Sequence, residues 1–146
     1  VDGLLTVDMP PEEAGLFNDE LKAVGLDNIL LLAPTTTVER AKRITALASG
    51  FLYYVSLKGV TGAGHLDVES VRAKLAEFSN LTDVPICVGF GIKDPETARA
   101  IADFADGVIV GSALVTKRGD LAHADSNEIA DTVAELVGSI RVALDA

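Results

Sequence analysis

Short runs of aliphatic and β-branched residues recur along the chain, with more polar segments between them. Five such runs occupy residues 3–8, 28–33, 51–56, 85–90 and 107–112. Each run is continuous rather than alternating in polarity, which is typical of parallel strands that are buried on both faces. The pattern therefore predicts five strands that belong to a parallel sheet.

The segments between these runs have apolar residues at helical spacing and residues that favour helix starts. Thr36 with Glu39 forms a capping-box pattern, and Asp94 is an N-cap followed by a proline at the first helical position. The remaining helices are expected after Pro10-Pro11, after Asp67 and from Ser126 onward. The chain is therefore an unbroken alternation of strands and helices.

Five consecutive βα units without a break in composition predict one α/β domain with right-handed crossovers over residues 1–146. Two architectures fit this order: an open doubly wound sheet, or part of a (β/α)₈ barrel. Both place binding sites at the C-terminal ends of the strands. The residues that follow each apolar run are therefore the candidates for chemistry.

Two of these strand ends carry glycine turns. Gly89-Phe90-Gly91 lies at the end of the fourth run and Gly111-Ser112 at the end of the fifth. Small residues at such turns let backbone N–H groups approach an anion closely. A short helix over residues 113–116 would add partial positive charge at its N-terminus. Barrels commonly bind phosphate through their last two strand loops and such a helix, so this pair of turns favours the barrel and a phosphate site.

The loop after the third run is rich in glycine and has the composition of a mobile lid. Three glycines lie within residues 59–64, and Thr61 supplies a hydroxyl at the centre of the segment. Such a loop suits closure over a bound ligand. A flexible connector without function is the alternative.

Composition limits the partners and the compartment. The net charge of −10 argues against nucleic acid and anionic membranes, which both reward a basic face. No apolar run approaches the roughly 20 residues that span a bilayer.

The single Cys87 excludes an internal disulfide, so the cytoplasm is the expected compartment. His65 and His123 lack partners at metal-ligand spacing, so no metal site is predicted. A chain that starts with Val1 at the edge of an apolar run suggests a piece of something longer.

The ordered set of motifs resembles the tryptophan synthase alpha subunit from Val1 to about Thr116. The segment VDGLLTVDMPPEEA is similar to that family's fourth strand and the following turn, and FLYYVSLKGVTGA is similar to its sixth strand and lid. VGFGI and VGSALV resemble its two phosphate-binding turns. The resemblance implies a partial (β/α)₈ barrel and a lyase that cleaves indole-3-glycerol phosphate to indole and glyceraldehyde 3-phosphate. It also implies a beta subunit as partner, which holds the pyridoxal phosphate, and no cofactor in this chain.

The resemblance assigns roles to individual positions. Thr61 would lie in the lid, and Asp8 would lie near the lid and the subunit interface as an auxiliary group. The phosphate would be bound by Gly62, Gly91, Gly111 and Ser112, and the indole ring by Leu5, Leu31, Tyr53 and Phe90. The family's two catalytic carboxylates fall in a region before Val1, so no residue of this chain matches either.

Three alternatives remain beside these assignments. Asp8 is equally suited to cap the turn at Met9-Pro10-Pro11. Another phosphate-binding barrel enzyme, an isomerase or synthase of the indole or histidine pathways, shares paired glycine turns late in the chain. A non-catalytic half-barrel module is the third alternative, because five strands cannot close an eight-stranded barrel and two sheet edges would stay unpaired.

Overall fold

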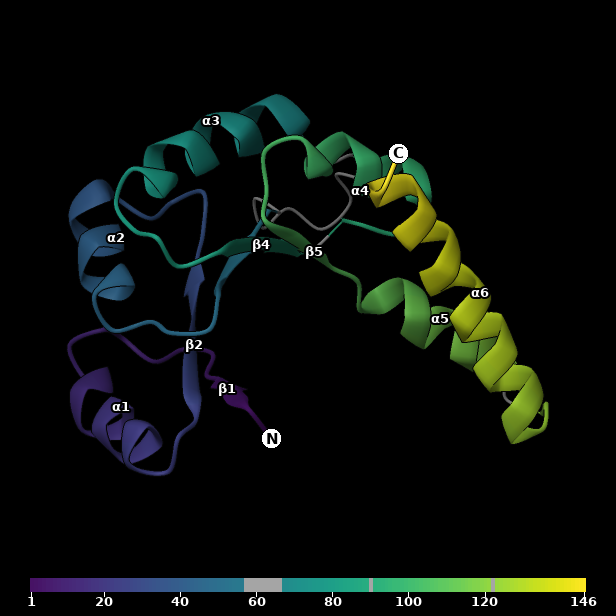
Figure 1. The fold of residues 1–146 in the computed structure, drawn as a ribbon, viewed down its shortest axis with the longest axis horizontal. Coiled ribbons are helices and arrows are strands. Elements are labelled where there is room, and N and C mark those ends of the chain that lie inside the picture. Colours follow the sequence, from purple (N-terminus) through teal and green to yellow (C-terminus); the bar gives the residue numbers. More distant parts are fainter. Residues whose placement is uncertain (57–66, 90, 122) are drawn as a thin grey trace.

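The computed structural model describes residues 1–56, 67–89, 91–121 and 123–146. Within these residues each predicted apolar run overlaps a strand (Figure 1). The strands are β1 (Gly3–Leu5), β2 (Asp27–Leu32), β3 (Leu52–Val55), β4 (Ile86–Gly89) and β5 (Gly107–Ile109). The helices are α1 (Ala14–Ala23), α2 (Val38–Thr45), α3 (Val68–Ser79), α4 (Pro95–Ala102), α5 (Ser112–Asp120) and α6 (Ser126–Leu144).

The strand order separates the two predicted architectures. The sheet has five parallel strands in the order β1-β2-β3-β4-β5, so each strand pairs with its neighbour in sequence. A doubly wound sheet would reverse its order at a switch point, whereas a barrel adds each strand on the same side. The sheet and its helices form an arc (Figure 1), with α1 to α4 on the convex side. The fold is a partial (β/α)₈ barrel.

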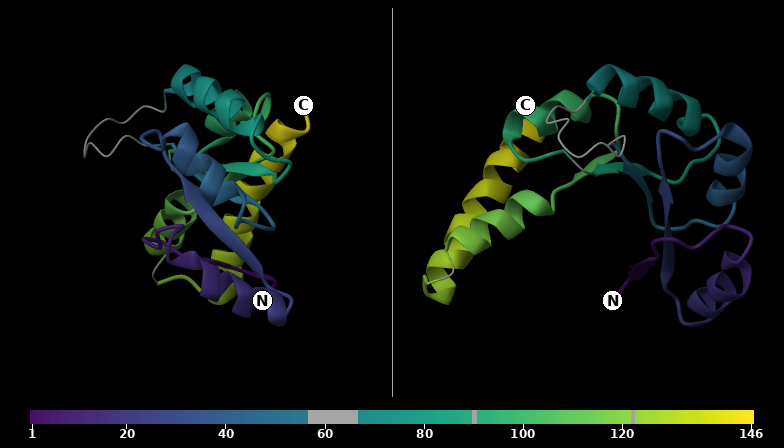
Figure 2. Two further views of the ribbon diagram at one scale, coloured as in Figure 1. Left: turned by 90° about the vertical axis from the view of Figure 1, so that its left-hand side faces the viewer. Right: turned by 180° about the vertical axis from the view of Figure 1, so that it is seen from behind.

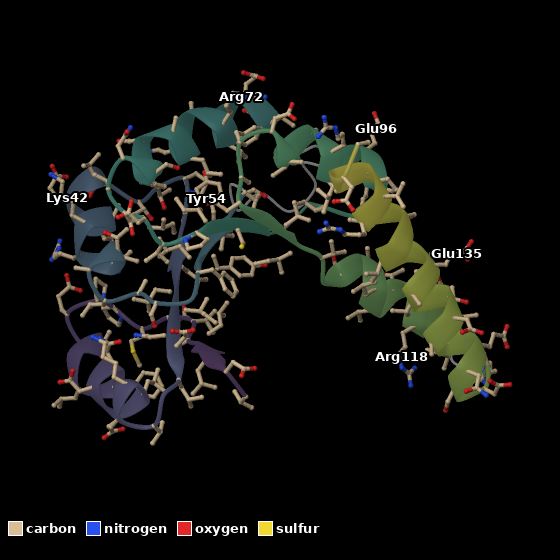
Figure 3. The ribbon with its side chains drawn as sticks, in the orientation of Figure 1. Lys42, Tyr54, Arg72, Glu96, Arg118 and Glu135 are labelled. Carbon is tan, nitrogen blue, oxygen red and sulfur yellow. The ribbon has the colours of Figure 1, made fainter. Side chains whose placement is uncertain are left out.

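The hydrophobic core lies between the sheet and the helices of the convex side. Side chains of β2, β3 and β4 alternate between full burial and partial burial along each strand. The buried set includes Leu32, Leu52, Tyr54, Ile86 and Val88, which pack in one cluster with side chains of α2, α3 and α4. Figure 3 shows Tyr54 between the sheet and α3, and the charged side chains of Lys42, Arg72 and Glu96 on the outer side of the helices.

The concave face is only half buried, which corrects the prediction of strands buried on both faces. Leu31 and Tyr53 are opposite each other in the β2–β3 register, and Tyr53 is opposite Cys87 in the β3–β4 register. All three are partly exposed. The apolar runs are continuous because these positions face the interior of a barrel, and five strands do not enclose that interior.

Side-chain caps start four of the helices. Asp67 and Asp94 cap α3 and α4 as predicted, by accepting hydrogen bonds from Ser70 N–H and Thr97 N–H. One predicted cap is wrong by one residue, because Thr37 rather than Thr36 caps α2. The last helix begins at Ser126 as predicted, with Asp125 as its N-cap. Thr36 Oγ1 instead accepts a hydrogen bond from Ala33 N–H (3.0 Å), which holds the turn after β2.

The last two helices lie side by side and extend from the end of the arc opposite the N-terminus (Figures 1 and 2). Helix α5 runs over Ser112–Asp120, so the predicted short helix at residues 113–116 exists and is longer than expected. Helix α6 packs along α4 and buries Ile140. Among the described helices, none combines the length and apolar character that crossing a membrane requires.

Tyr54 carries a hydroxyl that is fully buried and has no hydrogen-bond partner among the described residues. Its ring packs against Phe78 with the ring centroids 6.2 Å apart. Burial without a partner disfavours the ionised form and raises the pKa of Tyr54 to about 12. The hydroxyl therefore costs folding free energy at every pH.

We predict that Tyr54→Phe raises the free energy of unfolding by about 1 kcal/mol, because the variant no longer buries an unpaired hydroxyl. In the parent, stability is complete below pH 10 and falls as the pH rises from 10 toward about 12, because only the unfolded tyrosine ionises there. Phenylalanine cannot ionise, so the stability of the variant lacks this fall between pH 10 and about 12. Urea unfolding of the parent and the variant at pH 7 and pH 11 measures both effects. A less stable variant at pH 7 would contradict the unpaired hydroxyl.

Candidate functional site

Three residues of the predicted phosphate site lie together at the C-terminal ends of β4 and β5. Gly91 follows β4, and Gly111 and Ser112 follow β5. A pocket of about 160 Å³ is lined by Tyr53, Gly91, Ile92, Ile109, Gly111 and Ser112. We call this the glycine pocket. None of its described lining residues is charged, so the attraction that these residues offer an anion comes from the backbone.

Helix α5 directs its N-terminus into the glycine pocket. Gly111 is its N-cap and provides no side-chain hydrogen bond to the first turn. The N–H groups of Leu114 and Val115 donate to the carbonyl of Gly111 at 3.0 and 3.1 Å. The N–H groups of Ser112 and Ala113 precede the first intrahelical bonds and have no partner among the described residues. Two N–H donors at a helix N-terminus favour an anion such as phosphate.

The glycines of this region are required for different reasons. Gly91 has φ +82°, a left-handed conformation that side chains strongly disfavour. Gly89 has no room for a side chain, because an added Cβ would overlap the ring and hydroxyl of Tyr53. At Gly111, by contrast, no described atom lies within 4 Å of an added Cβ, and φ is −119°. The fold does not demand glycine there, whereas a ligand close to the backbone would.

Both ends of the turn after β4 are anchored. At its start, the ring of Tyr53 covers Gly89. At its end, Asp94 and Thr97 form a capping box at α4, and Thr97 Oγ1 accepts a hydrogen bond from Lys93 N–H at 3.2 Å. The hydrogen bonds from the backbone and side chain of Thr97 hold the pKa of the Asp94 carboxyl below its ordinary value of 3.8. The turn that contains Gly91 is thus tied to two rigid elements.

Three of the four residues predicted for the indole pocket lie on the concave face. Leu31 is opposite Tyr53 in the register, and Leu5 is opposite Ile29, two residues before Leu31 on the same strand. Burial raises the pKa of the Tyr53 hydroxyl above its ordinary value of 10.0. These side chains form an apolar wall that continues from the glycine pocket.

A family model described as tryptophan synthase alpha chain matches residues 1–144. The chain belongs to the tryptophan synthase alpha chain family. The match decides against the isomerases and synthases that share paired glycine turns. It also covers the final helix, in which the sequence by itself carries no diagnostic residue.

Relatives and solved structures of the tryptophan synthase alpha chain family align with nearly the whole chain. The alpha chain of Methylococcus capsulatus is 54% identical over 146 residues, which are 100% of this chain and 54% of that protein. The alpha chain of Halorhodospira halophila is 48% identical over 99% of this chain and 52% of its own length. The chain therefore spans about half the length of the curated relatives that it matches.

The solved structures agree with this partial coverage. The alpha subunit from Legionella pneumophila matches with a TM-score of 0.82 and 39% identity, over 99% of this chain and 52% of that one. A tryptophan synthase α2β2 complex from Pyrococcus furiosus matches with a TM-score of 0.80 and 32% identity, over 96% of this chain and 55% of that one. At these identities the likeness extends beyond the fold to the family.

Asp8, the auxiliary residue suggested by the resemblance to the tryptophan synthase alpha family, has a strained backbone. Its φ is +60°, a left-handed value that is uncommon for residues other than glycine. Its carboxylate is exposed and makes no hydrogen bond or ion pair with the described residues, so they provide no support for the turn-capping alternative. It lines a second pocket of about 430 Å³, at the C-terminal ends of β1 and β2, with Thr6, Leu31, Thr36 and Arg40 among its other lining residues.

Thr61 and Gly62 of the expected lid and Phe90 of the expected indole pocket lie outside the described residues. Among the described residues, no three His, Cys, Asp or Glu side chains form a group suited to a metal ion. Ile92, Ile109 and Ser56 were not among the predicted site residues. The two isoleucines line the glycine pocket, and Ser56 hydrogen-bonds to the end of β4. The sequence signal that could have identified Ser56 is a serine at the end of an otherwise apolar strand run.

We predict that Gly89→Ala lowers the free energy of unfolding by about 1–3 kcal/mol, because the new methyl group must displace the Tyr53 ring. Adding Tyr53→Leu should recover part of the loss, since the shorter side chain frees the space. Urea unfolding of the single and double variants measures this coupling. Gly138→Ala in α6 is the matched control, because no described atom outside its own helix backbone lies within 4 Å of the new Cβ. Strictly additive effects of the two changes would show that the residues do not compete for space.

We predict that Asp94→Ala lowers the free energy of unfolding at pH 7 by about 1 kcal/mol through loss of the N-cap. The folded carboxyl has a lowered pKa, so its contribution is complete above the ordinary value of 3.8 and is lost as the pH falls through the folded value. The difference between variant and parent should therefore shrink below pH 4. Unfolding at pH 7 and pH 3 tests this, with Asp131→Ala on the exposed face of α6 as control. A difference that is equal at both pH values would exclude the charged cap.

Proposed function

We propose that this chain forms the phosphate-binding part, and part of the indole-binding wall, of a tryptophan synthase alpha subunit. That subunit cleaves indole-3-glycerol phosphate to indole and glyceraldehyde 3-phosphate. The observation that carries the proposal is the glycine pocket, where Gly91, Gly111 and Ser112 surround the N-terminus of α5. In this proposal residues 1–146 are the C-terminal portion of a single (β/α)₈ barrel domain.

The proposed substrate fits the arrangement of polar and apolar groups. A phosphate dianion would accept hydrogen bonds from the N–H groups of Ser112 and Ala113, and the partial positive charge of α5 would stabilise it. The aromatic ring of Tyr53 borders the same pocket and leads to Leu31 on the neighbouring strand. An aryl glycerol phosphate needs this combination of an anion cradle and an apolar slot. In the same proposal Thr61 and Gly62 close over the phosphate, and Phe90 completes the indole wall.

The proposed reaction needs a general acid and a general base besides the binding groups. Retro-aldol cleavage protonates the indole carbon and removes a proton from the hydroxyl of the side chain. We place these two carboxylates outside this chain, and assign to its own residues the binding and orientation of the substrate. Fixing the phosphate in the glycine pocket would hold the carbon–carbon bond at a set distance from those groups.

We further propose a tryptophan synthase beta subunit as the partner, with pyridoxal phosphate bound in that subunit. The likeness to the α2β2 complex of Pyrococcus furiosus supports this partner. Asp8 is the residue of the chain that best suits a coupling role, because its exposed carboxylate is held at a strained position beside the pocket at β1 and β2. The biosynthetic role of the family supports the cytoplasm as the compartment.

The proposal predicts activity in a hybrid subunit. In this hybrid, residues 1–146 replace the matching segment of the Methylococcus capsulatus alpha chain, which is 54% identical. We expect the hybrid to release indole from indole-3-glycerol phosphate. Gly111→Asp in the hybrid should raise KM about tenfold or more, because a carboxylate beside the phosphate repels it, and tenfold corresponds to about 1.4 kcal/mol.

Gly111→Asn is the matched control for this charge effect. Asparagine has the same shape as aspartate and caps a helix equally well, and an added Cβ has open space at this position. Its KM should stay well below that of Gly111→Asp. Equal KM values for the two variants would place the phosphate away from Gly111. A folded hybrid that releases no indole would overturn the proposed function.

A further inference from the structure

Ser56 lies at the end of β3, outside the glycine pocket, and hydrogen-bonds to the last residue of β4. The residue is 8% exposed. Ser56 Oγ donates to the carbonyl oxygen of Gly89 at 2.8 Å, and Ser56 N–H donates to the same oxygen at 3.2 Å. The N–H bond continues the parallel ladder between the two strands, which any residue other than proline would provide. The hydroxyl adds a second bond that only a few residue types supply.

Gly89 is where the chain leaves β4 for the proposed phosphate turn. Gly91, two residues further, has φ +82° and lines the glycine pocket. The Tyr53 ring lies against the α-carbon of Gly89 on the concave face. Glycine by itself leaves the backbone conformationally free, so the direction of the exit depends on what holds this residue.

Two side chains of β3 therefore hold Gly89 from different directions. Tyr53 limits its α-carbon by contact, and Ser56 fixes the orientation of its carbonyl with two donors. The other end of the turn is held by the capping box of Asp94 and Thr97. A hydroxyl in a nearly buried place costs free energy unless it is bonded, so its presence at this strand end needs a reason.

We propose that Ser56 is a positioning residue for phosphate binding: its hydroxyl orients the Gly89 carbonyl and thereby sets the placement of Gly91 in the glycine pocket. This inference rests on the proposed function and deepens it. Ser56 is not among the residues that line the pocket, and in this proposal it does not contact the substrate. It acts through the backbone of β4. Loss of the hydroxyl should weaken phosphate binding without changing the chemistry that follows.

The test compares Ser56→Ala and Ser56→Thr in the hybrid subunit. For Ser56→Ala we expect KM for indole-3-glycerol phosphate and the inhibition constant of glycerol 3-phosphate to rise together by about three- to tenfold, the range of one hydrogen bond. The value of kcat should stay within about twofold, because tenfold there would require about 1.4 kcal/mol at the transition state alone. Ser56→Thr keeps a hydroxyl and should restore both constants.

Ser79→Ala is the matched control, because Ser79 Oγ also donates to a backbone carbonyl, that of Leu75, at 2.9 Å within α3. It should leave KM and the inhibition constant unchanged. A folded Ser56→Ala hybrid with unchanged constants would overturn the inference. A parallel fall of kcat and thermal stability that Ser56→Thr does not repair would also overturn it, because that result indicates a structural role only.

A second measurement separates this inference from the proposed function. If the unsubstituted hybrid folds but has no activity, the proposed function fails, and amide hydrogen exchange at residue 56, whose N–H donates to the same Gly89 carbonyl, then decides the positioning role. Ser56→Ala should speed this exchange about three- to tenfold relative to the unsubstituted hybrid, after correction for the intrinsic rates of the two residues. Ser79→Ala should not. Equal exchange in all three proteins would show that the Ser56 hydroxyl does not hold the turn.

Discussion

The register between β3 and β4 determines what each face of the sheet presents. Val55 is opposite Gly89, and Tyr53 is opposite Cys87. This pairing directs Tyr53 to the concave face and the adjacent Tyr54 into the core beneath α3. A slip of one residue would exchange the two faces and bury the wrong tyrosine. The same pairing brings Tyr53 and Ser56 to opposite sides of Gly89, so the start of the proposed phosphate turn depends on it.

The register is well defined because the core side of the two strands is tightly packed. Leu52, Tyr54, Ile86 and Val88 are at most 2% exposed. The half-buried concave side constrains the register less, since its residues have more freedom to shift. Packing on the convex face thus sets the geometry of a site on the opposite side of the sheet. Tyr54 therefore lies outside the site but helps to position it through its packing in the core.

Much of the fold follows from local pattern. The continuous apolar runs predicted every described strand. Most helix starts were predicted from the alternation of runs with helices and from the acidic caps at Asp67 and Asp94. Two features could not be predicted from the sequence, for physical reasons: the residue that caps α2, and the face of the sheet that the helices cover. Neighbouring Thr36 and Thr37 have the same capping chemistry, so only the tertiary path selects between them. A continuous apolar run also carries no sign of which face the helices cover.

The site shows the same division between local and non-local information. The glycine turns could be found from sequence because each is a short motif at a strand end. Their order along the chain also matches that of the resembling family. The hydrogen bond of Ser56 to Gly89 spans 33 residues and leaves no motif. The contact of Tyr53 with Gly89 is equally non-local, so sequence predicts the aromatic ring near the pocket but not its steric role.

The proposed phosphate site also accounts for how a chain with a net charge of −10 would hold a dianion. No charged side chain occurs among the described residues that line the glycine pocket. Lys117 and Arg118 lie in the last turn of α5, about 8 Å along the helix axis from Ser112, where they complement the negative end of the helix dipole. Within the described part of the chain, the donors for the phosphate are the backbone N–H groups at the start of α5, and the α5 dipole adds partial positive charge. Such donors depend on exact backbone placement, because they cannot reorient toward a ligand as a lysine side chain does. A site of this kind therefore needs rigid anchors around its turns, which is what Ser56, Tyr53 and the capping box at α4 provide.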